Sequence, residues 1–196
     1  MSVAAPRLPP APDVVTAAEL LAAADDGVWS DSVVRGVRLA GAVLEDCRFV
    51  DCRFEGCDLA GVRFVRLSLR RVELVECRLT GVDLGAARLT DVRFSGCKLD
   101  DANLRSVQGE RVAFDDTVLA ASDFQSASLA GAVFSSCRMA GADLRRASLA
   151  GATFPGTDLT EVVGLDGLRG AALDRDQAVS LAIRLAAEVG IVVLDD

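Results

Sequence analysis

Residues 124–154 read FQSASLAGAVFSSCRMAGADLRRASLAGATF, and every fifth residue of this segment is large and apolar. The same register extends from Val34 to Leu159 without a slip. It covers 26 positions, of which only Gly109 lacks a large apolar side chain, and it includes all eight Phe. An α-helix repeats every 3.6 residues and a strand every two, so neither generates a strict period of five. The pattern predicts a coil with corners at equal intervals.

A second period, of twenty residues, lies on top of the first. Phe54, Phe94, Phe114, Phe134 and Phe154 are separated by multiples of twenty, so residues twenty apart are expected to stack. Four five-residue faces then make one turn of a square coil. Turns that pair as parallel strands lie about 4.8 Å apart, which predicts a rod of roughly 6.5 turns and ~31 Å.

A small or apolar residue precedes each large one by two positions, and all six Cys belong to this class. They are Cys47, Cys52, Cys57, Cys77, Cys97 and Cys137. Their spacings of five and twenty differ from the Cys-x-x-Cys hairpins of zinc sites. We therefore predict reduced, buried cysteines that act as small hydrophobes, and no metal site.

Glycine recurs two positions after many of the large residues, for example at Gly131, Gly141 and Gly151. A tight corner favours a residue without a Cβ, so these glycines indicate turns rather than a phosphate-binding loop. Gly109 is expected to be a local defect, where either Leu89 and Leu129 lean into the gap or the face kinks. If the backbone there is ordinary, Gly109→Leu is expected to stabilise the rod.

The composition excludes many enzyme classes. The chain has no His and no Tyr, which removes Ser-His-Asp and Cys-His triads and imidazole metal ligands. Outward carboxylate pairs such as Asp115 and Asp116 would lie on a convex rod without a desolvated cleft to raise a pKa. We expect no catalytic residue and no cofactor, whereas an enclosed pocket with converging acids would favour an enzyme.

The charge balance argues against direct binding of nucleic acid. The net charge is −8, and the basic residues are twenty Arg and one Lys, so phosphate backbones should repel the molecule. No apolar run approaches the roughly 18 residues that span a bilayer. Residues 1–26 lack the basic and apolar regions of a signal peptide. We expect a cytoplasmic protein without membrane contact.

The amino-terminal segment, residues 1–31, is predicted to cap the coil. Thr16 and Glu19 form a capping box before a helix expected over 17–24, which ends at residues 25–27. Trp29 is expected to plug the first coil, and a ligand platform is the alternative interpretation.

The carboxyl-terminal segment, residues 164–196, follows a coil assigned to residues 32–163. Asp174 and Gln177 predict a second capping box, and the helix after it is expected to end at Gly190. Residues 191–194 predict a short apolar strand, which either completes the cap or offers an edge to a partner. The expected dimer interface is Leu181, Leu185, Ile191, Val192, Val193 and Leu194.

Several segments resemble the A-[DN]-L signature of pentapeptide-repeat proteins, among them Ala102-Asn103-Leu104 and Ala142-Asp143-Leu144. The resemblance covers residues 32–163 and implies an all-β solenoid, the right-handed quadrilateral β-helix. Residues 173–194 also resemble the carboxyl-terminal helix and strand of quinolone-resistance proteins of the MfpA and Qnr type. That element joins two rods end to end, which implies a homodimer.

Those resistance proteins are described as acidic mimics of B-DNA that occupy the DNA saddle of DNA gyrase. The resemblance implies a modulator or protector of gyrase. The charge distribution of this chain departs from that of an acidic DNA mimic. Residues 33–161 hold 17 basic and 18 acidic side chains, so the excess acid lies near the ends. The alternative is an interaction scaffold for an unrelated protein partner.

If mimicry is the mechanism, its contacts are expected from acids that neighbouring Arg do not offset. These are Glu73, Glu76, Asp115 and Asp116 on one face, with Asp158, Glu161 and Asp166 near the dimer junction.

Overall fold

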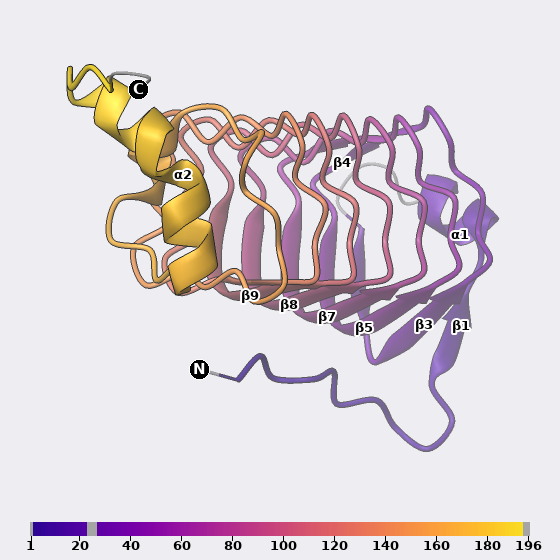
Figure 1. The fold of residues 1–196 in the computed structure, drawn as a ribbon. Coiled ribbons are helices and arrows are strands. Elements are labelled where there is room, and N and C mark those ends of the chain that lie inside the picture. Colours follow the sequence, from indigo (N-terminus) through magenta and orange to yellow (C-terminus); the bar gives the residue numbers. More distant parts are fainter. Residues whose placement is uncertain (1, 23–26, 194–196) are drawn as a thin grey trace.

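The chain forms a parallel β-solenoid of about six turns with a short helix near one end and a longer helix at the other (Figure 1). The computed structural model describes residues 2–22 and 27–193. Its elements are β1 (Asp13–Val15), α1 (Ala17–Ala22), β2 (Val28–Ser30), β3 (Ser32–Arg35), β4 (Val43–Glu45), β5 (Arg48–Glu55), β6 (Arg63–Val65), β7 (Ser68–Val75), β8 (Arg88–Ser95), β9 (Gln108–Asp115), β10 (Val133–Ser135), the 3-10 helix η1 (Leu165–Leu168) and α2 (Arg175–Glu188).

Strands β2 to β10 stack with a register of twenty residues, as the sequence predicts, whereas β1 pairs with β3 at a spacing of nineteen. The main sheet runs β1-β3-β5-β7-β8-β9-β10, with β2 also paired to β5, and β4 pairs with β6. Phe54 is aligned with Leu74, and Phe94 with Phe114. Beyond the named strands, isolated parallel bridges such as Arg138 to Asp158 continue the same register.

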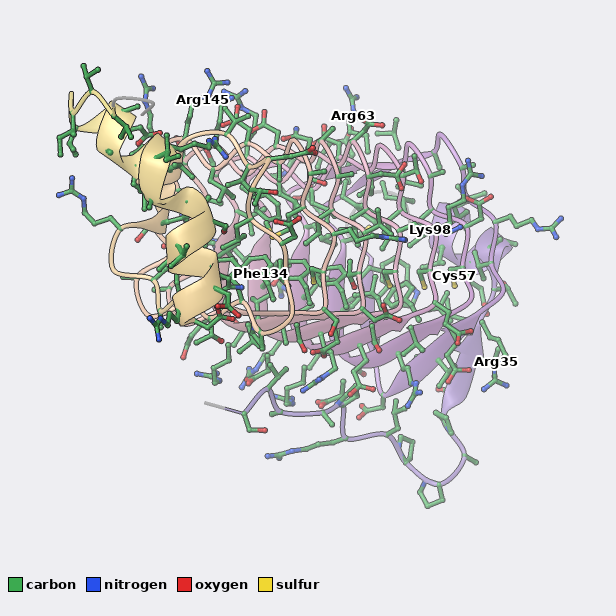
Figure 2. All side chains as sticks on the ribbon, in the orientation of Figure 1. Arg35, Cys57, Arg63, Lys98, Phe134 and Arg145 are labelled. Carbon is green, nitrogen blue, oxygen red and sulfur yellow. The ribbon has the colours of Figure 1, made fainter. Side chains whose placement is uncertain are left out.

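The large apolar residues of the five-residue register fill the inside of the rod, and all of them from Val34 to Leu159 are buried. Phe94, Phe114, Phe134 and Phe154 form a continuous stack with ring centroids 4.9–5.0 Å apart. Figure 2 shows Phe134 inside the coils, whereas the labelled arginines extend outward. The stack explains the repeated Phe at intervals of twenty, since flat rings fit the spacing between coils.

Every corner of the coil has a positive φ, from Asp31 through Gly156. Glycine occupies many of these corners, and Asp, Arg, Ala, Ser and Glu adopt the same left-handed conformation at the others. This conformation costs a residue with a Cβ roughly 1–2 kcal/mol. Many corner amides also donate to the next coil, as the Ala86 N–H does to the Arg105 carbonyl at 2.8 Å. Hydrogen bonds between stacked coils therefore stabilise a left-handed corner conformation that only some of the corner residues favour.

The six cysteines are free and buried, which confirms the prediction made from their spacing. Their thiols donate to backbone carbonyls, for example from Cys97 Sγ to the Leu74 carbonyl at 3.3 Å. Ser122 and Thr157 take the same position and donate to equivalent carbonyls at 2.6 and 2.8 Å. This position accepts a short side chain with one donor, which explains why Cys, Ser and Thr alternate there.

The cysteines are expected to resist a bulky thiol reagent in the native protein. Burial raises the pKa of the Cys47 and Cys137 thiols to about 11 each, so little reactive thiolate exists at neutral pH. Labelling before and after denaturation, counted by intact mass, measures this. Rapid modification of several cysteines without denaturant would contradict it.

Gly109 leaves a gap that a neighbouring side chain fills. A Cβ built on Gly109 would lie 2.4 Å from Leu129 Cδ2 and 2.8 Å from Val112 Cγ2, and the glycine φ is not in the left-handed region. Leu129 therefore leans inward, which is one of the two expected arrangements. The expectation that Gly109→Leu stabilises the rod is corrected, because the space is already occupied.

Gly109→Leu is instead expected to lower the free energy of unfolding by about 1–3 kcal/mol through overpacking. Leu129→Ala alone removes buried methyl groups and should cost about 2–5 kcal/mol. The double variant should lose less than the sum, since the new side chain enters the space that Leu129 vacates. Chemical denaturation of all three variants measures this coupling, and strict additivity would show that the two positions do not share the gap.

The amino-terminal cap follows the prediction. The Thr16 N–H donates to Glu19 Oε2 at 2.7 Å and the Glu19 N–H to Thr16 Oγ1 at 3.3 Å, which completes the capping box of α1. Trp29 stacks on Phe49 with ring centroids 4.7 Å apart, as a plug of the first coil should. Residues 23–26, which include the last two residues expected for this helix and the first two of its expected stop at 25–27, lie outside the described residues.

The carboxyl-terminal helix α2 closes the other end. Its capping box joins Asp174 and Gln177, and the Gln177 side chain also donates to the carbonyls of Phe154 and Thr157 at 2.6 and 2.8 Å. Leu181 is fully buried beneath the helix. Residues 191–193 form no strand, which differs from the prediction, because a short apolar segment needs a neighbouring strand to pair with. Leu194 lies outside the described residues.

Candidate protein-binding surface

The outer surface of the rod presents charged side chains in columns with a spacing of one coil. Many of them pair with the residue twenty positions away. These coil-to-coil pairs are Arg35 with Glu55, Arg66 with Asp46, Arg71 with Asp51, Arg78 with Asp58 and Arg111 with Asp91. The near-neutral shaft is thus a set of local ion pairs, and such pairs present little net field to a partner.

Two of the predicted contact acids belong to such pairs. Glu73 lies between Arg53 and Arg93 in the sheet, and its Oε2 is 3.5 Å from Arg53 Nη1. Asp115 pairs with Arg93. The expectation that neighbouring arginines do not offset these acids is wrong for both, because β-strand stacking places residues 20 and 22 positions apart side by side.

Glu76 and Asp116 are exposed on one corner of the rod and form no ion pair among the described residues. They are two coils apart, with Gly96 between them, and the Glu76 Cγ lies 3.5 Å from the place of a Gly96 Cβ. Both have positive φ. The backbone positions of these two acids are therefore about 9.6 Å apart along the rod axis, at the usual separation of parallel strands.

Asp158 and Glu161 lie on the next face and line one shallow indentation with Arg138, with a volume of about 180 Å³. The Thr160 N–H donates to Asp158 Oδ1 at 2.8 Å, and this bond holds the pKa of Asp158 below its usual value. Asp166 is separate, in η1, where it accepts from the Arg146 N–H at 3.2 Å. Arg146 belongs to the column of corners that lies ten residues, half a coil, from the column of Glu76 and Asp116, so the seven acids share neither one face nor two adjacent faces.

The exposed apolar side chains of α2 and the residues after it form a second surface. We define this apolar surface as Val179, Ile183, Leu185, Val189, Ile191, Val192 and Val193, each at least 36% exposed. Leu185, Ile191, Val192 and Val193 were predicted interface residues. Leu181 is a correction: it is buried against the rod within one chain, so it anchors the helix instead of facing a partner.

Sequence reasoning missed the position of the amino-terminal segment. Residues 2–12 run along the outside of the rod beside β5, β7 and β8 (Figure 1). Their amides bond to Asp51 and Asp91, the two acids that pair with Arg71 and Arg111. The alternation of Asp and Arg every twenty residues was the available signal for the corner, and nothing periodic marks the segment that covers it.

Within residues 2–22 and 27–193, no group of three or more acid or cysteine side chains could hold a metal ion. In the same part of the chain, no helix has the length and apolar character to cross a membrane. The core void beside Leu74 and Phe94 measures about 20 Å³, close to the volume that one water requires.

Comparisons with known proteins give a family and several solved structures. Residues 47–112 and 87–163 match the family model described as "Pentapeptide repeat region". No match was found among curated proteins. Two trypsin-treated forms of QnrB1, a plasmid-mediated fluoroquinolone resistance protein, are 20% and 18% identical, with TM-scores of 0.39 and 0.40. They cover 86% and 93% of this chain, which spans 90% and 97% of theirs.

A third solved structure is HetL, from the cyanobacterium Nostoc sp. strain PCC 7120. It is a pentapeptide repeat protein involved in the regulation of heterocyst differentiation. HetL is 19% identical over 76% of this chain and 90% of its own, with a TM-score of 0.25.

Proposed function

We propose that this chain, which belongs to the pentapeptide-repeat family, acts without catalysis by binding another protein, with DNA gyrase as the best single candidate partner. The observation that carries the proposal is the set of exposed carboxylates on rigid coils. Glu76, Asp116, Asp158 and Glu161 form no ion pair among the described residues, so their charge is available to a partner. We call these four the free acids.

A protein surface that binds DNA phosphates is positively charged, and acids at fixed positions can attract it. The gyrase candidate rests on this chemistry and on the resemblance of residues 173–194 to the quinolone-resistance proteins. Glu73 and Asp115 already pair with arginines, so each of these two acids contributes less to an electrostatic contact with gyrase. The free acids, with Asp166, are therefore expected to supply most of the electrostatic contact.

The ion-paired shaft favours a second candidate, an interaction scaffold for a different protein. A partner that recognises the ladders of Arg and acid side chains by shape and hydrogen bonding needs no net charge on the rod. Such a complex would depend on the rigid spacing of the coils and only weakly on salt.

The deciding experiment is a DNA gyrase supercoiling assay with and without a fluoroquinolone. The natural chain is compared with a variant of all seven predicted acids and with a variant of the free acids alone, each changed to Asn or Gln. A matched control neutralises four acids elsewhere, Asp13, Asp31, Asp83 and Glu110. We expect the natural chain and the control to inhibit gyrase or to protect it from the drug.

Both acid variants are expected to lose this effect, and rising salt should weaken the natural chain's effect steeply. If the natural chain neither inhibits nor protects, gyrase is removed as a partner. Equal activity of the free-acid variant would leave shape recognition of gyrase and exclude electrostatic mimicry.

The same chain is proposed to form a homodimer through the apolar surface of α2. Seven exposed apolar side chains within residues 179–193, three in α2 and four after it, are more than a solvated cap requires. Light scattering at tens of micromolar is expected to give twice the chain mass. Val179→Glu with Ile183→Glu should give a monomer, and Ser180→Glu, on the same helix, should remain a dimer. A monomeric natural chain would contradict this proposal.

A further inference from the structure

The amino-terminal segment is attached to one corner of the solenoid by two backbone hydrogen bonds. The Ala4 N–H donates to Asp91 Oδ1 at 3.2 Å, and the Arg7 N–H donates to Asp51 Oδ1 at 3.0 Å. In Figure 1 this segment follows the rod axis instead of winding with the coils. The contacts therefore join a linear peptide to a column of stacked corners.

The corner consists of Asp51, Arg71, Asp91 and Arg111, which we call the corner ladder. Arg71 Nε is 2.6 Å from Asp51 Oδ1 and Arg111 Nε is 2.7 Å from Asp91 Oδ1. Both aspartates are only 7% exposed and have positive φ, so the coil fixes their carboxylates. In each carboxylate the same oxygen, Oδ1, accepts from an arginine Nε and from an N–H of the segment.

The spacing of the corner ladder matches the repeat of an extended peptide. Asp51 and Asp91 are two coils apart, about 9.6 Å at the usual strand separation. Three residues of polyproline II span about 9.3 Å. Amides three residues apart in the segment can therefore reach aspartates that are two coils apart. The Ala4 N–H donates to Asp91 in this way, and the Arg7 N–H donates to Asp51.

The sequence of the segment suits this conformation. Prolines 6, 9, 10 and 12 restrict the backbone to extended geometry, and both residues that donate, Ala4 and Arg7, retain their N–H. Val3 and Pro6, three residues apart, are both half-buried. The guanidinium of Arg71, and after it the N–H of Arg7, hold the pKa of Asp51 below its usual range. The segment thus presents periodic donors, and the charge of Arg7 near Asp51, to two fixed aspartates that are each already paired with an arginine.

We propose that the corner ladder is a docking site for a basic, proline-rich peptide in the polyproline II conformation, and that residues 2–12 occupy it in cis. An extended segment of another protein with the same chemistry binds when residues 2–12 leave the ladder. This site is separate from the free acids and does not depend on gyrase as the partner.

The test uses the full chain with both donors removed by Ala4→Pro and Arg7→Pro. These changes delete the two N–H groups, preserve an extended backbone and leave the solenoid unaltered. A labelled synthetic peptide with the sequence of residues 2–12 is titrated against this variant by fluorescence anisotropy. We expect saturable binding, and at least about tenfold weaker binding to the natural chain, whose own segment competes at high effective concentration.

A matched control carries Ala5→Pro and Ala11→Pro, at positions whose amides donate to no described group. It should bind the peptide as weakly as the natural chain. A peptide with proline in place of both donors should not bind, and a peptide with Arg7→Ala should bind several-fold more weakly. Absence of peptide binding to the donor-free chain would overturn the docking site. Equal binding to the natural chain would overturn occupancy by residues 2–12.

Discussion

Phe134→Ala is expected to lower the free energy of unfolding by about 3–5 kcal/mol, the range for a fully buried aromatic side chain. Phe134 stacks on Phe114 and Phe154 with ring centroids 4.9 and 5.0 Å apart, and meets Phe124 edge-on at 6.0 Å. Its loss leaves a cavity between coils and breaks the aromatic stack in the middle. Chemical denaturation followed by circular dichroism measures the change.

Two comparisons separate burial from stacking. Phe64 is also buried but has no stacked ring among the described residues. Phe64→Ala should therefore lower the free energy of unfolding less than Phe134→Ala does. The difference should be about 0.5–1.5 kcal/mol for each aromatic pair that only Phe134→Ala removes. Phe134→Leu should be tolerated better than Phe134→Ala, because Leu74 naturally occupies the same column between Phe54 and Phe94. Equal losses in the two alanine variants would show that stacking adds nothing to burial.

The fold was predictable because a single coil is repeated. The period of five fixes which side chains point inward, and the period of twenty fixes which residues stack. Both appear from β2 to β10 without a shift in register, and pairs nineteen residues apart occur only at the two ends of the rod. The six cysteines were predictable for the same reason. The sequence correctly predicted a local defect at Gly109. That Leu129 fills the gap depends on side-chain packing, which a periodic pattern does not specify.

The surface was less predictable because charge pairing depends on neighbours in three dimensions. The pairs at a spacing of twenty follow from the repeat, so the partner of Asp51 could have been read from the sequence. The Arg93 to Asp115 pair is diagonal, at a spacing of 22, and depends on side-chain direction. The docking of residues 2–12 has no periodic signal at all, because the segment lies outside the repeat.

Gly167→Ala is expected to detach the carboxyl-terminal cap, at a cost of about 3 kcal/mol or more. A Cβ on Gly167 would lie 2.0 Å from the Leu144 carbonyl oxygen and 3.0 Å from its carbonyl carbon. These are backbone atoms of the preceding coil, so they cannot rotate away, and η1 must lift from the rod. Leu165 and Leu168, at 3% and 7% exposure, would then lose their burial. Amide exchange along α2 should rise by at least tenfold.

Gly85→Ala is the matched control for this contact. Gly85, like Gly167, has no positive φ, but its Cβ would meet only side-chain ends, Asn103 Nδ2 and Asp83 Oδ1, both at 3.1 Å. Those groups can shift by a few tenths of an ångström, so we expect a loss below about 1 kcal/mol. If Gly167→Ala were as mild as this control, with α2 still protected from exchange, then close backbone contact would not be what seats the cap. Detachment of the cap in Gly167→Ala should also abolish the proposed dimer. Leu181 would no longer anchor α2, so the apolar surface would no longer be held in place.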